Sequence, residues 1–158
     1  MKALSAAGAH GLVWIAIAAV LAVRFRRPLV LVATIAAELV AGQVDAVLKD
    51  AIGRDRPPVA DPAVHALIPV PSDPSMPSGH AVMAFAGAVL LGVVASRLRW
   101  PLGALAVAIA VSRVYLGVHY PSDVIVGTAV GAVIGAASAV VLRVGERRLA
   151  GRRVIRAE

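Results

Sequence analysis

The sequence predicts an all-α protein, a bundle of about five helices that crosses a membrane. Of its 158 residues, 59% are hydrophobic and 16% are charged, and the mean hydropathy is +0.84. A soluble domain usually has about 25% charged residues, so a bilayer is the expected solvent. The length is that of one domain, 1–158. The chain has no cysteine, which excludes disulfides and thiolate metal sites.

Five apolar segments approach the length of a membrane helix, which needs about 20 residues with a range of roughly 17–25. We expect helices at residues 3–23, 28–48, 79–95, 102–118 and 124–142. The first segment follows Lys2 and could be a signal peptide. A helix of the bundle is the favoured interpretation, because the apolar stretch exceeds a typical signal-peptide core and basic residues follow it directly.

Arginine placement predicts the topology. Eleven arginines lie in the first and third connections and after the fifth segment: Arg24, Arg26, Arg27, Arg97, Arg99, Arg143, Arg147, Arg148, Arg152, Arg153 and Arg156. Cytoplasmic loops are enriched in Lys and Arg, so we expect the N-terminus outside and the C-terminus in the cytoplasm of a multi-pass plasma-membrane protein. The basic tail, 143–158, is interpreted as an anchor near anionic headgroups. Nothing aromatic accompanies it, so no nucleic-acid partner is expected despite the formal net charge of +7.

The segment 57–77 differs from the rest, because it holds seven of the ten prolines. Proline lacks an N–H and fixes φ, which excludes a regular helix. We expect an ordered outer loop, which is either a lid or binding loop or a passive connector.

Small residues recur at every fourth position in two segments: Ala84, Ala88 and Gly92, and Gly127, Gly131 and Gly135. This spacing lets membrane helices approach closely. Both series are predicted to be packing seams within the bundle rather than a dimer interface.

Three polar clusters lie at the predicted outer ends of the helices. They are Lys49 with Arg56 and Pro57; Pro77, Ser78, Gly79 and His80; and Ser112 and Arg113 with His119 and Asp123. Cations within membrane segments need an anionic partner, and guanidinium groups match phosphoryl oxygens. Ser78 is a predicted N-cap, which would present free N–H groups to a phosphate, and Gly79 would allow close approach.

His119 and Asp123 form a candidate nucleophilic pair. A carboxylate bonded to one imidazole nitrogen fixes the tautomer and leaves the other nitrogen to attack phosphorus, which would give a phosphohistidine. His80 is placed to protonate the leaving oxygen. No close set of two histidines and a carboxylate is present, so we expect neither a metal nor another cofactor.

Other ionisable residues have simpler interpretations. His10 and His65 are expected to be structural. Asp45 lies one turn before Lys49 and is predicted to pair with it. Glu38 either bonds across helices or binds a lipid or a proton, since an acid within a membrane segment is a functional candidate.

The clusters resemble the signature of the type 2 phosphatidic acid phosphatase family, K-x6-RP, PSGH and SR-x5-H-x3-D. All eleven positions of that signature match: Lys49, Arg56, Pro57, Pro77, Ser78, Gly79, His80, Ser112, Arg113, His119 and Asp123. The resemblance implies metal-independent hydrolysis with His119 as nucleophile, Asp123 as its partner and His80 as acid. It also implies phosphate binding by Lys49, Arg56, Ser78, Gly79 and Arg113, with Pro57, Pro77 and Ser112 in support. Bacterial members commonly have six spans, one more than the five expected here.

The expected protein is therefore an integral membrane lipid phosphatase, a phosphoric monoester or acid-anhydride hydrolase. Polyprenyl diphosphate is the first expected substrate. Phosphatidylglycerol phosphate, phosphatidic acid and polyprenyl-phosphosugar phosphate are alternatives, as is haloperoxidase chemistry with bound vanadate. The alternative from another class is a non-catalytic membrane protein that binds lipid headgroups.

Overall fold

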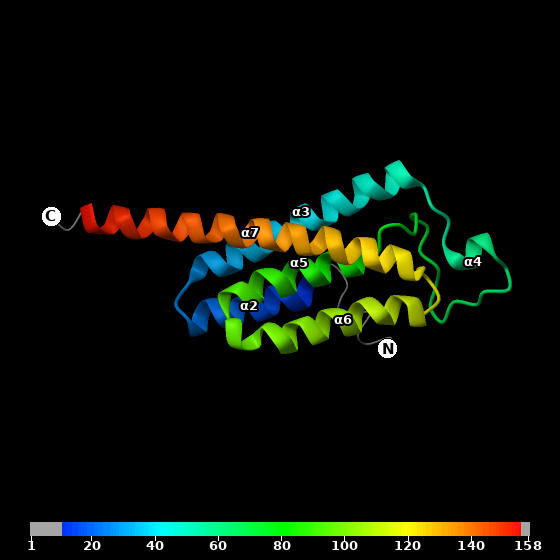
Figure 1. Ribbon diagram of the computed structural model, residues 1–158, viewed down its shortest axis with the longest axis horizontal. Coiled ribbons are helices and arrows are strands. Elements are labelled where there is room, and N and C mark those ends of the chain that lie inside the picture. Colours follow the sequence, from blue (N-terminus) through cyan, green and yellow to red (C-terminus); the bar gives the residue numbers. More distant parts are fainter. Residues whose placement is uncertain (1–10, 156–158) are drawn as a thin grey trace.

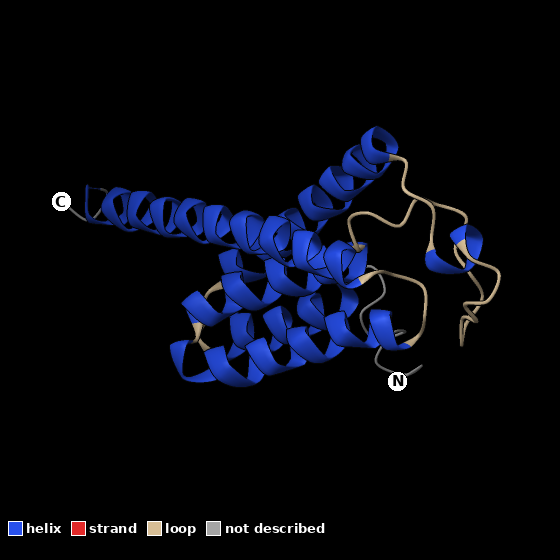
Figure 2. Cartoon of the chain, turned by 45° about the vertical axis from the view of Figure 1, so that its right-hand side comes forward, coloured by secondary structure: helices blue, strands red, loops and turns tan. Residues whose placement is uncertain are grey.

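The computed structural model describes residues 11–155, with side chains to residue 150, and every regular element in this range is helical (Figures 1 and 2). The elements are α2 (Leu12–Arg24), α3 (Pro28–Ile52), α4 (Pro57–Ala60), α5 (Gly79–Val94), the 3₁₀ turn η2 (Ser96–Leu98), α6 (Arg99–Tyr115) and α7 (Pro121–Ile155). The all-α prediction is confirmed. The expectations for Lys2, His10 and the start of the first helix, and for the side chains of Arg152, Arg153 and Arg156, lie outside the described residues.

Helix α5 lies at the centre of the bundle and packs against α7, α6, α3 and α2 (Figure 1). Its Leu90 and Leu91 are fully buried, together with Trp14 of α2 and Ile109 of α6. Trp14 packs directly over Gly87 of α5, where no Cβ could fit. The first apolar segment therefore contributes to the core as a helix of the bundle.

Within the described residues, three helical regions are long and apolar enough to cross a membrane, and they lie within Pro28–Ala60, Ser96–Tyr115 and Pro121–Ala150. Helices α2 and α5 have 13 and 16 residues. At 1.5 Å per residue, α5 rises only about 24 Å, less than the roughly 30 Å hydrocarbon core. All five predicted segments contain a helix, but two of these helices are shorter than a full span in the described part of the chain.

Several helix boundaries differ by three or four residues from the approximate predicted ones, and α3, for example, ends at Ile52 rather than at residue 48. Helix α6 ends at Tyr115 rather than at residue 118, because Gly117 takes a left-handed φ of 72° after the C-cap Leu116, a common way to stop a helix. The last helix begins at Pro121 rather than at residue 124, since proline suits the first helical position.

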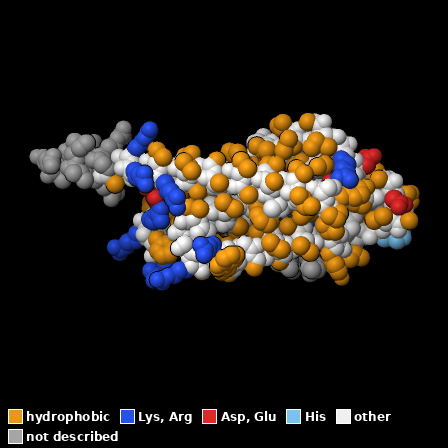
Figure 3. All heavy atoms as spheres, in the orientation of Figure 1, with side chains coloured by type: hydrophobic (Ala, Val, Ile, Leu, Met, Phe, Trp, Pro, Cys, Tyr) orange, Lys and Arg blue, Asp and Glu red, His pale blue; other side chains and the backbone are white. Residues whose placement is uncertain are grey.

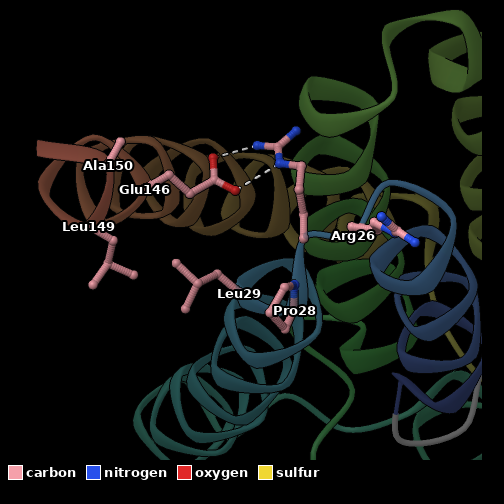
Figure 4. Close-up of a pocket in the computed structure, with 7 residues that line it drawn as sticks. Arg26, Pro28, Leu29, Glu146, Leu149 and Ala150 are labelled. Carbon is pink, nitrogen blue, oxygen red and sulfur yellow. Dashed lines mark hydrogen bonds and ion pairs between the residues drawn. The ribbon is translucent and has the colours of Figure 1, made fainter. Parts of the chain in front are cut away.

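Helix α7 also continues to Ile155, past its predicted end at residue 142, so the described part of the basic tail is helical. Arg, Glu, Leu and Ala in this stretch favour a helix. The guanidinium of Arg27, just before α3, donates two hydrogen bonds to the Glu146 carboxylate of α7 (Figure 4). This pair fastens the extension to the turn between α2 and α3.

The proline-rich segment is mostly irregular, but Pro57–Ala60 forms one helical turn, α4. The expectation of no helix was wrong for these four residues. Pro57 and Pro58 stand at its first two positions, where no helical N–H bond is required. The remainder lies beyond the end of the bundle that carries the polar clusters (Figure 1).

The small-residue series of α7 packs within the bundle, as predicted. Gly127, Gly131 and Gly135 face the backbone of α5 at Ser78, Val82 and Ala86 respectively.

Adding one methyl group at Gly131 is expected to destabilise the bundle. A Cβ there would collide with the Val82 carbonyl oxygen, and a helix backbone cannot turn aside as a flexible side chain can. We expect Gly131→Ala to lose about 1–3 kcal/mol or more through overpacking, measured as a lower Tm in detergent. Gly145→Ala on the same helix is the control, since its Cβ would meet nothing within 4 Å. An unchanged Tm for Gly131→Ala would contradict the close helix approach.

Candidate active site

The three polar clusters meet at one end of the bundle, opposite the arginine-rich end seen at the left of Figure 3. They surround a cavity of about 210 Å³. Its lining residues are Asp45, Lys49, Arg56, Pro71, Asp73, Gly79, His80, Met83, Arg113 and His119. Residues as far apart in the sequence as Asp45 and His119 thus line one small cavity.

Three buried cations give this cavity its charge. Lys49, Arg56 and Arg113 are each less than a tenth exposed. Lys49 Nζ lies 2.9 Å from Asp45 Oδ2, so the predicted ion pair one turn apart on α3 is present. A cluster of three cations in so small a space requires negative charge nearby.

Asp73, which sequence reasoning missed, supplies part of that charge. Its Oδ2 accepts a hydrogen bond from Lys49 Nζ at 2.6 Å and its Oδ1 accepts one from Arg56 Nη2 at 2.8 Å. Partial burial opposes ionisation, but the hydrogen bond and charge of Lys49, together with Arg56, hold the pKa of Asp73 below its usual value. The side chain is 48% exposed. The half-exposed Asp73 carboxylate of the loop therefore forms ion pairs with both Lys49 and Arg56.

His119 is buried in the wall of the cavity with both ring nitrogens engaged. Nδ1 lies 2.7 Å from the Ser75 carbonyl oxygen, and Nε2 lies 3.1 Å from Arg56 Nη1. A carbonyl only accepts, so we assign the proton of the neutral ring to Nδ1. Nε2 then presents its lone pair to Arg56.

Asp123 was expected to orient this ring, but the nearer acceptor is the Ser75 carbonyl. Asp123 Oδ2 is 3.5 Å from His119 Nδ1. The same oxygen accepts the Tyr120 N–H at 2.9 Å, the bond by which a residue in the first turn caps a helix start. Asp123 Oδ1 accepts from Arg54 Nη1 at 2.9 Å. The carboxylate thus joins the start of α7 to Arg54 and lies behind the imidazole.

Arg54 is a second residue that the motifs did not indicate. Its guanidinium stacks over the Tyr120 ring at 4.0 Å and donates to Ser122 Oγ at 2.7 Å. In the sequence it was only one of a few basic residues in the outer segments, and no spacing distinguished it.

The start of α5 closes another side of the site. Ser78 is the N-cap residue as predicted, but its side chain makes no capping bond. Its buried Oγ has no hydrogen-bond partner among the described residues. Gly79 brings the backbone against Asp45, where a Cβ would lie 2.6 Å from Oδ2. The glycine is therefore required by packing as well as being available for ligand approach.

The supporting residues lie outside the cavity wall. Pro57 begins α4, and Pro77 follows a cis peptide bond just before Ser78. Ser112 Oγ donates to the Ile109 carbonyl at 2.6 Å within α6. None of these three makes up the lining of the cavity.

Glu38 and His65 lie away from this centre. The Glu38 carboxylate is buried against Gly11 and has no hydrogen-bond partner among the described residues. His65 is exposed in the loop, and its carbonyl oxygen would lie 3.1 Å from a Cβ at Gly117.

The protonation state of His119 is set by its surroundings. Burial, the nearby charges of Arg56 and Arg113 and, more weakly, Lys49 lower its pKa to about 3, against the opposing hydrogen bond to Ser75. A lowered histidine pKa means that the ring is neutral at every pH above about 3. We expect the ¹³C resonance of His119, identified by its absence in His119→Asn, to stay at the neutral position from pH 8 to 5. A titration midpoint near 6.5 would contradict this environment.

The fold and the cavity together fit a membrane phosphatase, because three buried cations and a buried imidazole lie at one cavity at the end of a multi-pass bundle. The chain belongs to the PAP2 superfamily, whose family model matches residues 27–146. This confirms the family that the sequence motifs resemble.

Relatives with named activities agree with this assignment. The chain is 40% identical over 137 residues to decaprenylphosphoryl-5-phosphoribose phosphatase of Mycobacterium tuberculosis. The matched region covers 85% of this chain and 75% of the relative. It is 38% identical to undecaprenyl-diphosphatase of Sulfolobus acidocaldarius, over 77% of this chain and 60% of the relative. The fold is similar to the crystal structure of a transmembrane PAP2-type phosphatidylglycerolphosphate phosphatase from Bacillus subtilis, with a TM-score of 0.71 and 26% identity, covering 87% and 72% of the two chains.

Proposed function

We propose that this protein removes the terminal phosphate from a polyprenyl-linked lipid through a phosphohistidine at His119. The observation that carries the proposal is the buried His119 ring, whose Nδ1 lies 2.7 Å from the Ser75 carbonyl oxygen and whose Nε2 lies 3.1 Å from Arg56 in the wall of the cavity. An imidazole held in position, with its lone pair on the nitrogen that faces the cavity, is a competent nucleophile.

The proposed reaction has two steps. Nε2 of His119 attacks phosphorus while the bond from phosphorus to the leaving oxygen breaks, and His80 donates a proton to that oxygen. Water then attacks the phosphohistidine with His80 as base, which releases inorganic phosphate and restores the imidazole. Lys49, Arg56 and Arg113 stabilise the charge that builds on the phosphoryl oxygens.

The charge balance of the cavity supports binding of a phosphate dianion. Three cations face two carboxylates, those of Asp45 and Asp73, which leaves one positive charge. If a dianionic phosphate replaces Asp73, three positive charges meet one carboxylate and two phosphate charges, and the site is neutral. We therefore propose that Asp73 is a stand-in for the substrate phosphate and moves aside when it binds.

Neutralising Asp73 is expected to strengthen anion binding. Asp73→Asn removes the charge that competes for Lys49 and Arg56, and a charge-assisted bond contributes about 1.5–3 kcal/mol. We expect the inhibition constant of orthovanadate, an analogue of the phosphoryl transition state, to fall about tenfold. Asp61→Asn, an exposed loop residue outside the cavity, is the control. Unchanged vanadate inhibition in Asp73→Asn would contradict the proposal that Asp73 occupies the place of the substrate phosphate.

Two substrates fit this proposal. The relatives in Mycobacterium favour a polyprenyl-phosphosugar phosphate, because their match covers 85% of this chain and 75% of theirs. The relatives named undecaprenyl-diphosphatase favour polyprenyl diphosphate, which the sequence predicted first. In both, the phosphate removed is terminal and the remainder stays attached to a long isoprenoid chain.

A lipid panel tests the function. Purified protein in detergent is assayed for phosphate release from polyprenyl diphosphate, a polyprenyl-phosphosugar phosphate, phosphatidylglycerol phosphate and phosphatidic acid. We expect the polyprenyl-linked lipids to give the highest kcat/KM, with activity retained in EDTA. Equal or faster turnover of the glycerolipids would overturn the proposed substrate class, and loss of all activity in EDTA would overturn the metal-free mechanism.

We further propose that the cavity faces the extracytoplasmic side of the plasma membrane, because the arginines gather at the opposite end of the bundle and cytoplasmic loops are rich in arginine. The chain has no cysteine, so single-cysteine variants report topology directly. An impermeant maleimide applied to intact cells should label Ala63→Cys and leave Ala150→Cys unlabelled. The reverse pattern would place the site on the cytoplasmic side.

A further inference from the structure

A second cavity lies far from the candidate active site, at the arginine-rich end of the bundle. Its volume is about 410 Å³ and its lining residues are Phe85, Ala88, Val89, Gly92, Val93, Ser96, Arg99, Gly103 and Arg143. These residues come from α5, η2, α6 and α7. Helices α6 and α7 both pack mainly on α5 and contact each other little, so α5 forms the floor of a groove between them. We call it the α6–α7 groove.

The mouth of the α6–α7 groove carries two cations and no acid. Arg99 and Arg143 are both exposed, and none of the described residues that line the groove is acidic. Among the described residues, the acid at this end is Glu146, which lies in a neighbouring cavity and is already bound twice by Arg27 (Figure 4). The positive charge of the groove is therefore not neutralised by the described part of the protein.

An exposed tryptophan beside the groove indicates where its mouth lies relative to the membrane. The Arg99 guanidinium lies 5.2 Å from the Trp100 ring, and Trp100 is 75% exposed. Exposed tryptophans gather where the hydrocarbon core meets the headgroups. The two arginines therefore lie at headgroup level, and the floor of the groove leads from there into the hydrocarbon region.

That floor is apolar and has unfilled space. Phe85, Val89 and Val93 of α5 line it. Gly103 of α6 also lines it, and a Cβ at this position would meet nothing within 4 Å. A volume of about 410 Å³ lies within the range of roughly 300–1,000 Å³ typical of small-molecule sites.

We propose that the α6–α7 groove binds an anionic phospholipid from the adjacent leaflet. Its phosphate lies between Arg99 and Arg143, and one acyl chain runs over the α5 floor past Gly103. The two arginines alone could bind either a free anion or a lipid phosphate. The occupant is a lipid, because only a lipid also covers the apolar floor with its acyl chain. The bound lipid joins α6 to α7, where the protein itself supplies few contacts.

The binding is tested on the full chain in detergent by native mass spectrometry, with phosphatidylglycerol or phosphatidylcholine titrated in. We expect phosphatidylglycerol to be retained in preference to phosphatidylcholine. In the Arg99→Gln/Arg143→Gln double variant, phosphatidylglycerol affinity should fall about tenfold or more, since charge-assisted contacts to its phosphate are lost. The control is Arg97→Gln/Arg147→Gln, which removes the same charge at the same end from exposed residues outside the groove.

A charge-neutral variant tests the groove itself. Gly103→Leu keeps both arginines and fills the open space, so it should weaken phosphatidylglycerol binding several-fold. Phosphatase activity of every variant serves as the check on folding, because none of these residues lies at the candidate active site. Equal losses in the two double-arginine variants would overturn the proposal in favour of general surface attraction. Undiminished binding in Gly103→Leu would overturn the acyl-chain position.

Discussion

Replacing His119 by alanine is expected to abolish turnover while the bundle stays folded. The proposed nucleophile is lost, and His80, the other histidine that lines the cavity, serves as the proton donor in the proposed reaction. Removing a nucleophile that forms a covalent intermediate commonly costs on the order of 10³–10⁶ in kcat. We expect a loss of at least about 10³-fold in phosphate release, with KM changed much less because Lys49, Arg56 and Arg113 still bind the phosphate.

Two measurements separate this result from unfolding or from a pure binding role. His65→Ala is the matched control, since His65 is exposed in the loop and its loss should leave kcat unchanged. Acid-labile, alkali-stable phosphoryl label should be trapped on the wild type during turnover and be absent in His119→Ala. Turnover by His119→Ala within tenfold of wild type would overturn the phosphohistidine mechanism.

Much of the fold follows from hydropathy and small-residue spacing. The apolar segments became helices because backbone groups in lipid must bond internally, and the glycine series of α7 met α5 because close approach needs small residues. The helix ends were less predictable. Gly117 and Pro121 are local signals that hydropathy overlooks. Helix α7 runs past its apolar part through residues that favour a helix, and hydropathy does not reveal that Arg27 pairs with Glu146, 119 positions away.

Most of the predicted site residues share one cavity, but Ser78 and Asp123 are not among its lining residues, and the partners of the motif residues were missed. Lys49, Arg56, Arg113, Gly79, His80 and His119 line one cavity. Each belongs to a motif with fixed spacing, and each is a residue type suited to binding a phosphate or to reacting with it. Ser75 contributes only a backbone carbonyl, which side-chain motifs cannot reveal. Asp73 and Arg54 act through pairing across loops, and those distances depend on how the proline-rich segment folds back over the bundle.

The second large effect is expected for Arg56→Lys, which keeps the positive charge but loses the directed hydrogen-bond donors of the guanidinium. Its guanidinium donates to the carbonyls of Asp73 and Val118 at 2.9 and 3.0 Å and to the Asp73 carboxylate at 2.8 Å, and it lies 3.1 Å from His119 Nε2. A lysine ammonium is a single point and cannot span these positions. Arg56→Lys should therefore lower kcat/KM on the order of 10²–10³-fold, although the site keeps its charge.

The matched comparison is Arg54→Lys. Arg54 meets Asp123 through one nitrogen, Nη1, and is 36% exposed, so a lysine can keep that ion pair and activity should fall less than about tenfold. Buried carbonyls left without a donor cost about 1–3 kcal/mol each, so Arg56→Lys should also lower the Tm, while Arg54→Lys should not. Equal effects of the two substitutions would mean that positive charge alone serves the site. A large loss confined to Arg56→Lys would mean that the direction of its donors, toward both the loop carbonyls and the nucleophilic nitrogen, is what prepares His119 to receive phosphate.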